Sequence, residues 1–179
     1  MIGKMVYGEW LVPVVDYYSI LKSNERNYEI MIPLVVSLIT IISYHFWGDT
    51  LRALLKLRDI LPNALAILIG FTVSCITILV TSNSDSVKIM KETNTKDRYI
   101  RNSLISIFQW LFTNFVYILI IQVFLLAFIF FVSFILQFFK NSLVLHLALM
   151  IEVFLLLHIL LLIIRNITNF YFIFFVNKL

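Results

Sequence analysis

Residues 103–139 form one long stretch that contains no charged residue, proline or glycine. Residues 142–164 form a second apolar stretch, in which Glu152 is the only carboxylate. A helix of ~20 residues crosses the ~30 Å hydrocarbon core of a bilayer, at a rise of ~1.5 Å per residue. Only 13% of the 179 residues are charged, which is about half of the ~25% found in soluble domains. The sequence therefore predicts an integral membrane protein.

Four stretches are long and apolar enough to cross a membrane, which predicts an all-α, polytopic four-helix transmembrane bundle with interfacial amphipathic segments. The expected spans are residues 30–47, 64–80, 115–139 and 142–164. Because residues 103–139 are too long for one span and contain no dividing turn, residues 103–114 are assigned to a surface or extramembrane portion. The short connection at Lys140 and Asn141 predicts that the last two helices are antiparallel.

Three other segments are expected to lie at the membrane surface. Residues 1–29 interleave Trp and Tyr with charged residues, which favours an interfacial segment over an ordinary tail. Residues 48–63 alternate basic and leucine residues, which predicts an amphipathic surface helix that Pro62 ends or kinks. The tail, residues 166–179, is rich in Phe and Tyr but too short to cross, so it is expected along the interface.

Residues 81–102 form the one long polar connection, and a short helix is expected to begin in it near Ser86. With four spans, ten Lys and Arg residues fall on the side of this loop and the two termini, and four fall on the other side. Basic residues favour the cytoplasmic side of a membrane. We therefore expect a bacterial inner-membrane protein with a cytoplasmic loop and cytoplasmic termini.

Glu152 is the candidate for a polar site inside the membrane, because a carboxylate at that depth must face protein or water rather than lipid. On the preceding helix, Gln122, Ser133 and Gln137 fall within one arc and are expected to face it. Two interpretations stay open: Glu152 binds or relays an ion, or it is protonated and hydrogen-bonds a neighbour as a structural contact. His146 and His158 fall on other faces of its helix, which argues against a proton wire along that helix.

Small residues recur at every fourth position of the second span, at Ala66, Gly70 and Ser74. Such a stripe lets helix backbones approach closely, so it predicts a homo-oligomer. The polar loop carries a group of basic residues that could contact anionic lipid or a cytosolic effector protein, with a merely solvated connection as the alternative. These residues are Lys88, Lys91, Lys96, Arg98 and Arg101.

Catalysis is not expected from this sequence. It has a single cysteine, no His and Glu spacing typical of a metal site, and too little glycine for a phosphate-binding loop. We therefore expect no enzyme, no cofactor, no metal and no direct nucleic-acid contact. The leading hypothesis is a membrane subunit that self-associates and recruits or signals to a cytosolic partner. The alternative is a small channel or membrane-permeabilising toxin in which Glu152 lines the path.

The second span reads Leu-Ala-Ile-Leu-Ile-Gly-Phe-Thr over residues 65–72, and it is combined with a polar loop and a long uncharged third helix. This layout resembles small four-helix bacterial membrane proteins encoded beside phage-defence effectors, such as the membrane component of Kiwa-type systems. The resemblance covers about half the chain and carries over no site residue. It implies either an oligomeric membrane partner for a cytosolic effector in antiviral defence, or an effector that permeabilises the membrane.

Overall fold

The structure is a computed structural model that describes residues 8–138 and 141–175, without the side chains of residues 136–138, 174 and 175. The elements in chain order are α1 (Leu11–Ile20), α2 (Ser23–Arg26), the π-helix η1 (Asn27–Met31), α3 (Ile32–Trp47), α4 (Thr50–Thr81), α5 (Asp85–Glu92), β1 (Asn94–Ile100), β2 (Ser103–Ser106), α6 (Ile107–Phe138) and α7 (Ser142–Phe175).

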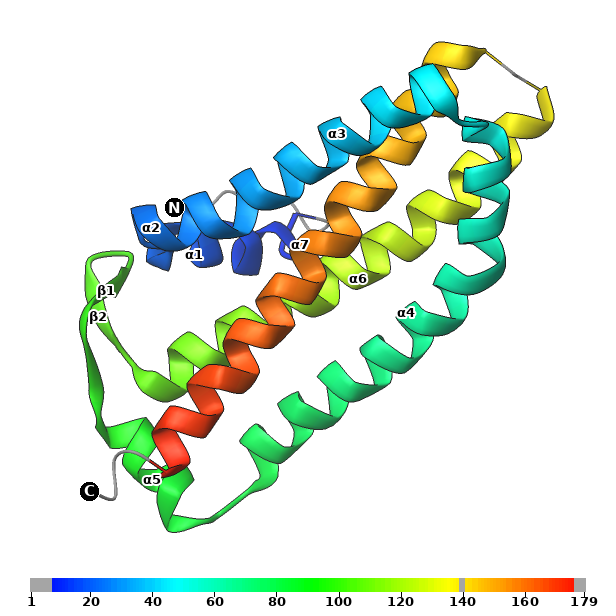
Figure 1. Ribbon diagram of the computed structural model, residues 1–179. Coiled ribbons are helices and arrows are strands. Elements are labelled where there is room, and N and C mark those ends of the chain that lie inside the picture. Colours follow the sequence, from blue (N-terminus) through cyan, green and yellow to red (C-terminus); the bar gives the residue numbers. More distant parts are fainter. Residues whose placement is uncertain (1–7, 139–140, 176–179) are drawn as a thin grey trace.

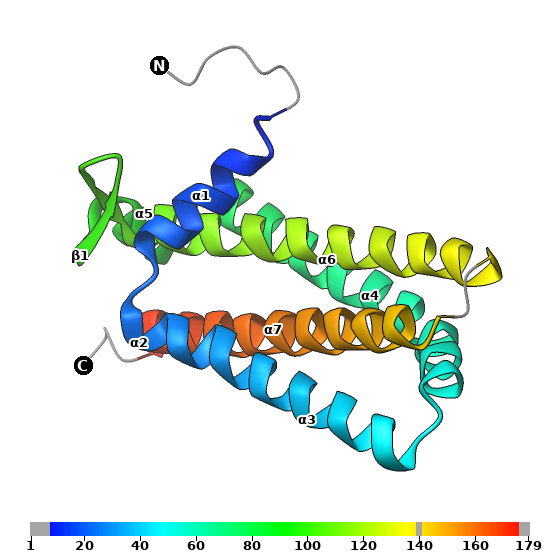
Figure 2. The ribbon, with the colours of Figure 1, turned by 90° about the horizontal axis from the view of Figure 1, so that it is seen from above.

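Four helical stretches in the described residues are long and apolar enough to cross a membrane, which confirms the four-helix bundle. They are Ser23–Trp47, Thr50–Thr81, Ile107–Ile135 and Ser142–Ile173. The helices pack in the order α3, α7, α6 and α4, and α4 also reaches α7. Figures 1 and 2 show the resulting elongated bundle, with α5 and the β1–β2 hairpin at one end. We call this the hairpin end and the opposite end the far end.

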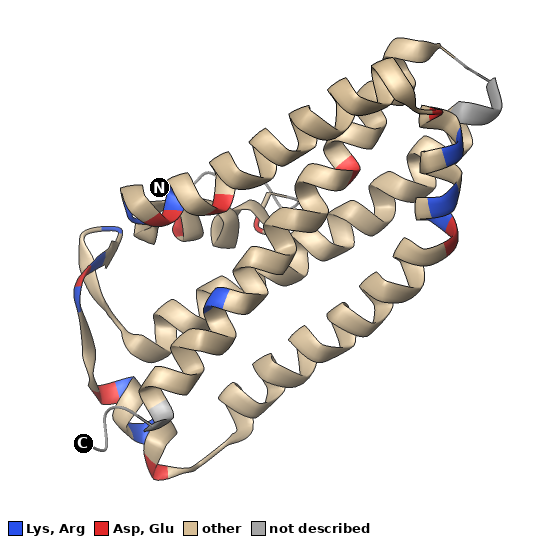
Figure 3. Cartoon of the chain, viewed as in Figure 1, with Lys and Arg blue, Asp and Glu red and all other residues tan. Residues whose placement is uncertain are grey.

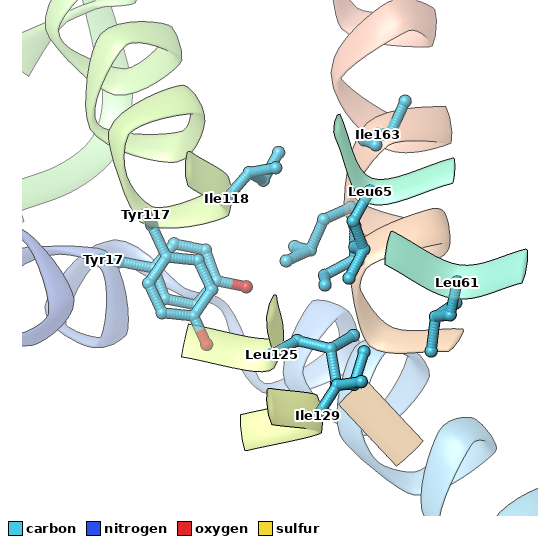
Figure 4. Close-up of a cluster of buried hydrophobic side chains, with 10 residues drawn as sticks. Tyr17, Leu61, Leu65, Tyr117, Ile118, Leu125, Ile129 and Ile163 are labelled. Atoms are coloured by element: carbon cyan, nitrogen blue, oxygen red, sulfur yellow. The ribbon is translucent and has the colours of Figure 1, made fainter. Parts of the chain in front are cut away.

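The core consists of apolar side chains that line the centre of the bundle. Leu61 and Leu65 of α4 pack with Leu125 and Ile129 of α6, as Figure 4 shows. Many large apolar side chains point outward instead, such as Ile67, which is 74% exposed. An outward apolar surface is what a lipid environment requires, because lipid tails solvate it as well as a protein core does.

The segment before the second span differs from the prediction. Thr50–Thr81 is one continuous helix of 32 residues, with Pro62 inside it, so the separate surface helix at 48–63 is wrong. Asp49 begins the helix, since its Oδ1 accepts a hydrogen bond of 3.1 Å from the Arg52 amide. Figure 1 shows that α4 bends within its length. A proline removes one backbone hydrogen bond and bends a helix that is otherwise well packed, rather than ending it.

The last two helices are longer than predicted. α6 begins at Ile107, so the expected start at residue 115 is wrong, and α7 runs to Phe175 instead of ending at residue 164. The expected interfacial tail is therefore wrong for residues 166–175, and residues 176–179 lie outside the described residues. Polar residues that suggested these ends contact one another inside the bundle: Asn114 Nδ2 donates to Asn166 Oδ1 at 3.2 Å.

The polar connection forms a small module outside the four spans. α5 starts at Asp85, where Ser84 caps it, in agreement with a helix expected near Ser86. The antiparallel hairpin that follows was not predicted; it turns at Arg101 and Asn102, which both have positive φ. Two consecutive positive φ values are the geometry that joins two strands most tightly. The Ile107 amide donates to the Thr93 carbonyl at 3.0 Å and closes the module onto α6.

Candidate functional site

Glu152, the sequence candidate, lies on α7 and is completely buried. Neither of its carboxylate oxygens has a hydrogen-bond partner among the described residues. Its electrostatic partner is Arg58 of α4, whose Nε and Nη2 are also buried without a hydrogen bond. We call these two residues the mid-bundle pair. Arg58 was expected in a separate amphipathic surface helix; it belongs instead to the continuous helix α4, where its side chain is half-buried.

The predicted companions of Glu152 are not gathered around it. Gln122 is also fully buried, and neither its amide oxygen nor its nitrogen has a hydrogen-bond partner in the described part of the chain. Ser133 donates to the Ile129 carbonyl of its own helix at 2.6 Å. The side chain of Gln137 lies outside the described residues. In the described part of the chain, Glu152 is therefore within electrostatic range of Arg58 without an ion pair or hydrogen bond to it, and no contact joins Glu152 to Gln122 or Ser133.

A second group of buried polar residues lies at the hairpin end. Arg98 of β1 donates from Nη1 and Nη2 to the two carboxylate oxygens of Glu25, at 2.9 and 2.5 Å. Its Nη1 also donates to the Ile20 carbonyl at 2.8 Å, and its guanidinium lies 4.3 Å from the centre of the Trp110 ring. Bidentate pairing with stacking is the geometry that favours Arg over Lys. Arg98 therefore clamps the hairpin to α2 and α6.

The same group continues into α7 through Arg165. Its Nη1 lies 2.6 Å from Glu29 Oε1, in ion-pair contact without hydrogen-bond geometry, and 3.6 Å from Glu25 Oε2. The other oxygen of Glu29 accepts a hydrogen bond from the Tyr17 hydroxyl. Burial and the facing carboxylate raise the pKa of Tyr17 well above its usual range, so its phenol stays a donor. We call Glu25, Glu29, Arg98 and Arg165 the hairpin-end network.

An aromatic chain extends from this network toward the middle of the bundle. Tyr17 and Tyr117 stack with ring centres 3.7 Å apart, as Figure 4 shows. The Tyr117 hydroxyl lies 3.0 Å from His158 Nε2, and His158 Nδ1 lies 2.8 Å from the Glu29 carbonyl. A carbonyl only accepts, so Nδ1 carries the proton and Nε2 of the neutral ring accepts from Tyr117.

The π-helix explains how Glu29 can contact Arg165 with its side chain and His158 with its backbone carbonyl. Residues Asn27–Met31 form η1, in which backbone carbonyls bond one residue further along than in an α-helix. Glu29 lies in this turn and is 1% exposed, with its side chain toward Arg165 and its carbonyl toward His158. Short π-helical turns recur at functional sites because they redirect backbone and side-chain groups.

The basic residues of the predicted contact surface divide into two kinds. Arg98 is 7% exposed and held by Glu25, so its expected role as a partner or lipid contact is wrong. Lys88, Lys91, Lys96 and Arg101 are exposed. Figure 3 shows charged residues gathered at the hairpin end and on the first half of α4, with few along the spans.

The small-residue stripe of α4 faces outward in the single chain. Ala66, Gly70 and Ser74 are all exposed, and a Cβ atom placed on Gly70 would meet no atom within 4 Å. The Ser74 hydroxyl donates to the Gly70 carbonyl of its own helix at 2.8 Å. The stripe therefore plays no part in packing the four spans of one chain.

Sequence reasoning missed most of the hairpin-end network. Glu25 and Glu29 were placed in a surface segment and Arg165 at the end of a span. One signal was present: two carboxylates four residues apart, just before an apolar stretch, require basic partners, and Arg165 interrupts the other long apolar stretch. Arg98, the other arginine of the network, lies on β1, a strand that was not predicted.

Comparison with known proteins adds no relative: no protein-family model, no curated protein and no solved structure matches this chain.

Proposed function

We propose that this protein is a non-enzymatic, multi-pass subunit of a bacterial inner membrane, whose hairpin module recruits a cytosolic partner and signals to the spans. The observation that carries the proposal is the clamp of Arg98. Arg98 ties a strand outside the bundle to Glu25 at the start of the first span. A surface that only solvates a loop does not need a buried bidentate ion pair to hold it.

The same contacts continue into the bundle, which supports a signalling role. Glu25 meets Arg165 of α7, and Arg165 meets Glu29. The Glu29 carbonyl meets His158, which meets Tyr117 of α6. A partner that shifts β1 would therefore act on α2, α7 and α6 through direct contacts rather than through lipid.

The distribution of exposed basic residues supports cytoplasmic termini and an acidic partner surface. In the described residues, six exposed Lys and Arg lie at the hairpin end: Lys22, Arg26, Lys88, Lys91, Lys96 and Arg101. Two lie at the start of α4, Arg52 and Lys56. This asymmetry favours the hairpin end on the cytoplasmic side, and exposed positive charge speeds encounter with acidic surfaces.

Two further parts of the proposal rest on the outward stripe and on the resemblance. The exposure of Ala66, Gly70 and Ser74 supports self-association through α4, because the stripe is unused within one chain. A role in antiviral defence follows only from the resemblance to Kiwa-type membrane components. A defence effector gene beside this gene is the expected outcome, and a neighbourhood without one removes that part of the proposal.

Site-specific photocrosslinking in the native host tests the recruiting role. A photoreactive residue at Lys96, on the exposed hairpin, is expected to give one discrete protein adduct, whereas the same residue at Ile67, on the lipid-facing side of α4, is not. Charge reversal by Lys88→Glu and Lys91→Glu is expected to abolish the adduct, and the matched reversal Lys56→Glu is expected to leave it. If the photoreactive residue at Lys96 crosslinks only to lipid and to no protein, the proposal is overturned.

The mid-bundle pair favours a second candidate, an ion path through the bundle. A buried carboxylate without hydrogen bonds, within electrostatic range of the half-buried Arg58, has free capacity for a proton or an ion. Ion flux in liposomes separates the candidates. Flux that disappears in Glu152→Gln supports the path, whereas no flux at any protein density, together with a hairpin adduct, supports the subunit.

A further inference from the structure

The outermost face of α4 is polar or small, whereas that of α6 is bulky and apolar. At ~100° per residue, the residues of α4 within ~40° of the direction opposite to its buried face form one line along the helix. This outer line includes Lys56, Asp59, Asn63, Gly70, Ser74 and Thr77, which are all exposed. Ile67 is the one large apolar side chain in it, whereas the exposed side chains of α6 include Phe124, Phe130 and Phe131. Lipid tails therefore suit the outer face of α6 better than that of α4.

The residues of the outer line differ in whether they need a partner. The hydroxyls of Ser74 and Thr77 donate to carbonyls of their own helix at 2.8 and 2.9 Å, so they need none. The side chains of Lys56, Asp59 and Asn63 form no hydrogen bond or ion pair with any residue that the structure describes. Asn63 directly precedes the apolar part of the span, where an amide without a hydrogen bond is costly.

Two copies of α4 that face each other in parallel are complementary along this line. Copies of one chain insert in the same orientation, so a two-fold axis between them runs along the spans. Lys56 and Asp59 lie on opposite sides of the line, ~60° apart around the helix. A two-fold axis places one side of a helix against the other side of its copy, so each Lys56 faces Asp59 of the second copy. Asn63 lies on the midline and faces its own copy, where the nitrogen of one amide can donate to the oxygen of the other.

We propose that the outer line of α4 is the face through which two copies of this chain form a parallel, two-fold dimer. The inference rests on the self-association proposed above, and it adds the face, the orientation and the register. Opposite charges fix the register at one end, and small residues allow close contact along the rest. A Cβ atom at Gly70 would meet no atom within 4 Å, so the backbone of a second helix has room there. Lipid tails offer neither the opposite charge nor the hydrogen-bond acceptor that this face lacks.

Charge reversal tests the register. Lys56→Asp alone and Asp59→Lys alone each place like charges across the two-fold axis, and each is expected to weaken the dimer roughly tenfold in detergent. The two single variants, expressed together with different tags, are expected to pair with each other, and a chain that carries both changes is expected to dimerise as the unchanged chain does. Lys88→Asp, the same reversal at an exposed position of α5, is the control and is expected to have no effect. Equal dimer fractions in all variants, or single variants that do not pair with each other, would overturn the proposal.

Disulfide crosslinking in membranes tests the face separately from self-association. In chains with Cys75→Ala, Gly70→Cys is expected to join two copies on mild oxidation, because close contact brings the two Cα atoms within the ~7 Å that a disulfide spans. Val123→Cys, at a position of α6 that is 51% exposed, is expected to stay monomeric. A crosslink through Val123→Cys alone would overturn this face and leave self-association intact, whereas a single-chain mass without crosslinks would remove both. The hairpin adduct at Lys96 is expected to persist in Lys56→Asp, so failure of the recruiting role is visible independently.

Discussion

The hairpin-end network and the mid-bundle pair both place opposite charges inside one bundle. They differ in the hydrogen bonds that the charged groups make. In the network, Arg98 and Glu25 share two hydrogen bonds, and Glu29 is met by both Arg165 and Tyr17. In the pair, neither oxygen of Glu152 nor the Nε of Arg58 has a hydrogen bond. Buried charges repay their desolvation only when such contacts are made. Arg165 is held by ion-pair contact alone, so the comparison rests on the hydrogen bonds of Arg98, Glu25 and Tyr17. It leads us to expect that the network holds the fold and that the pair does not.

The largest effect is expected where the network loses one partner. Arg165→Met leaves Glu29 buried without a cation, and removal of one member of a buried pair costs about 3–5 kcal/mol of unfolding free energy. Denaturant unfolding in detergent measures this loss. The double change Arg165→Met with Glu29→Met removes both charges and is expected to recover most of it. If the single change costs under about 1 kcal/mol, the network does not hold the fold.

The mid-bundle pair is expected to respond in the opposite direction. Replacing both members, Glu152→Leu with Arg58→Leu, exchanges charges that lack hydrogen bonds for apolar packing, which is neutral or stabilises by about 1–4 kcal/mol. The midpoint of thermal unfolding in detergent is the measurement. A double variant that unfolds more easily would show that this pair is a structural contact too, and the contrast between the two regions would disappear.

A smaller effect is expected when the positive charge of Arg98 is kept and the planar shape of its guanidinium is removed. Arg98→Lys keeps one positive charge but loses the bidentate hydrogen bonds to Glu25 and the stacking over Trp110. We expect a loss of roughly 1–2 kcal/mol. Protease cleavage in the hairpin is expected to become faster, because the strand is held less firmly. Cleavage at the unchanged rate would mean that charge alone holds the hairpin.

The smallest effect is expected at an ion pair beside the network but outside the bundle. Lys22 Nζ lies 2.7 Å from Asp97 Oδ2, and both side chains are about half exposed, at 46% and 58%. The hydrogen bond from Lys22 lowers the pKa of Asp97, yet exposed pairs contribute little to stability because water and salt screen them. Lys22→Ala is therefore expected to leave the unfolding midpoint unchanged. A shift as large as that of Arg98→Lys would place this pair within the network.

The apolar stretches were sufficient to predict four spans, because length and hydropathy alone distinguish a helix that crosses lipid. Their ends were predicted less well. Arg165 and Asn114 have the polarity of a helix end, but inside the bundle Arg165 forms an ion pair with Glu29 and Asn114 forms a hydrogen bond with Asn166. Burial of Glu152 followed from its cost in lipid, whereas its partner Arg58 did not, because the bend in α4 is a tertiary feature. The clamp required a hairpin with two non-glycine residues at positive φ, which no local pattern indicated.

The bend in α4 also bears on the kind of membrane that this protein can occupy. A straight helix of 32 residues would be ~48 Å long, well beyond a ~30 Å hydrocarbon core. Because the helix bends, its reach across the bilayer depends on the bend angle at Pro62 as well as on its length. A change of bilayer thickness can then alter the bend of α4, whereas α6 and α7, which have 32 and 34 residues and no proline, adjust by tilting. Hydrophobic mismatch therefore acts on α4 through its bend and on its two neighbours through their tilt.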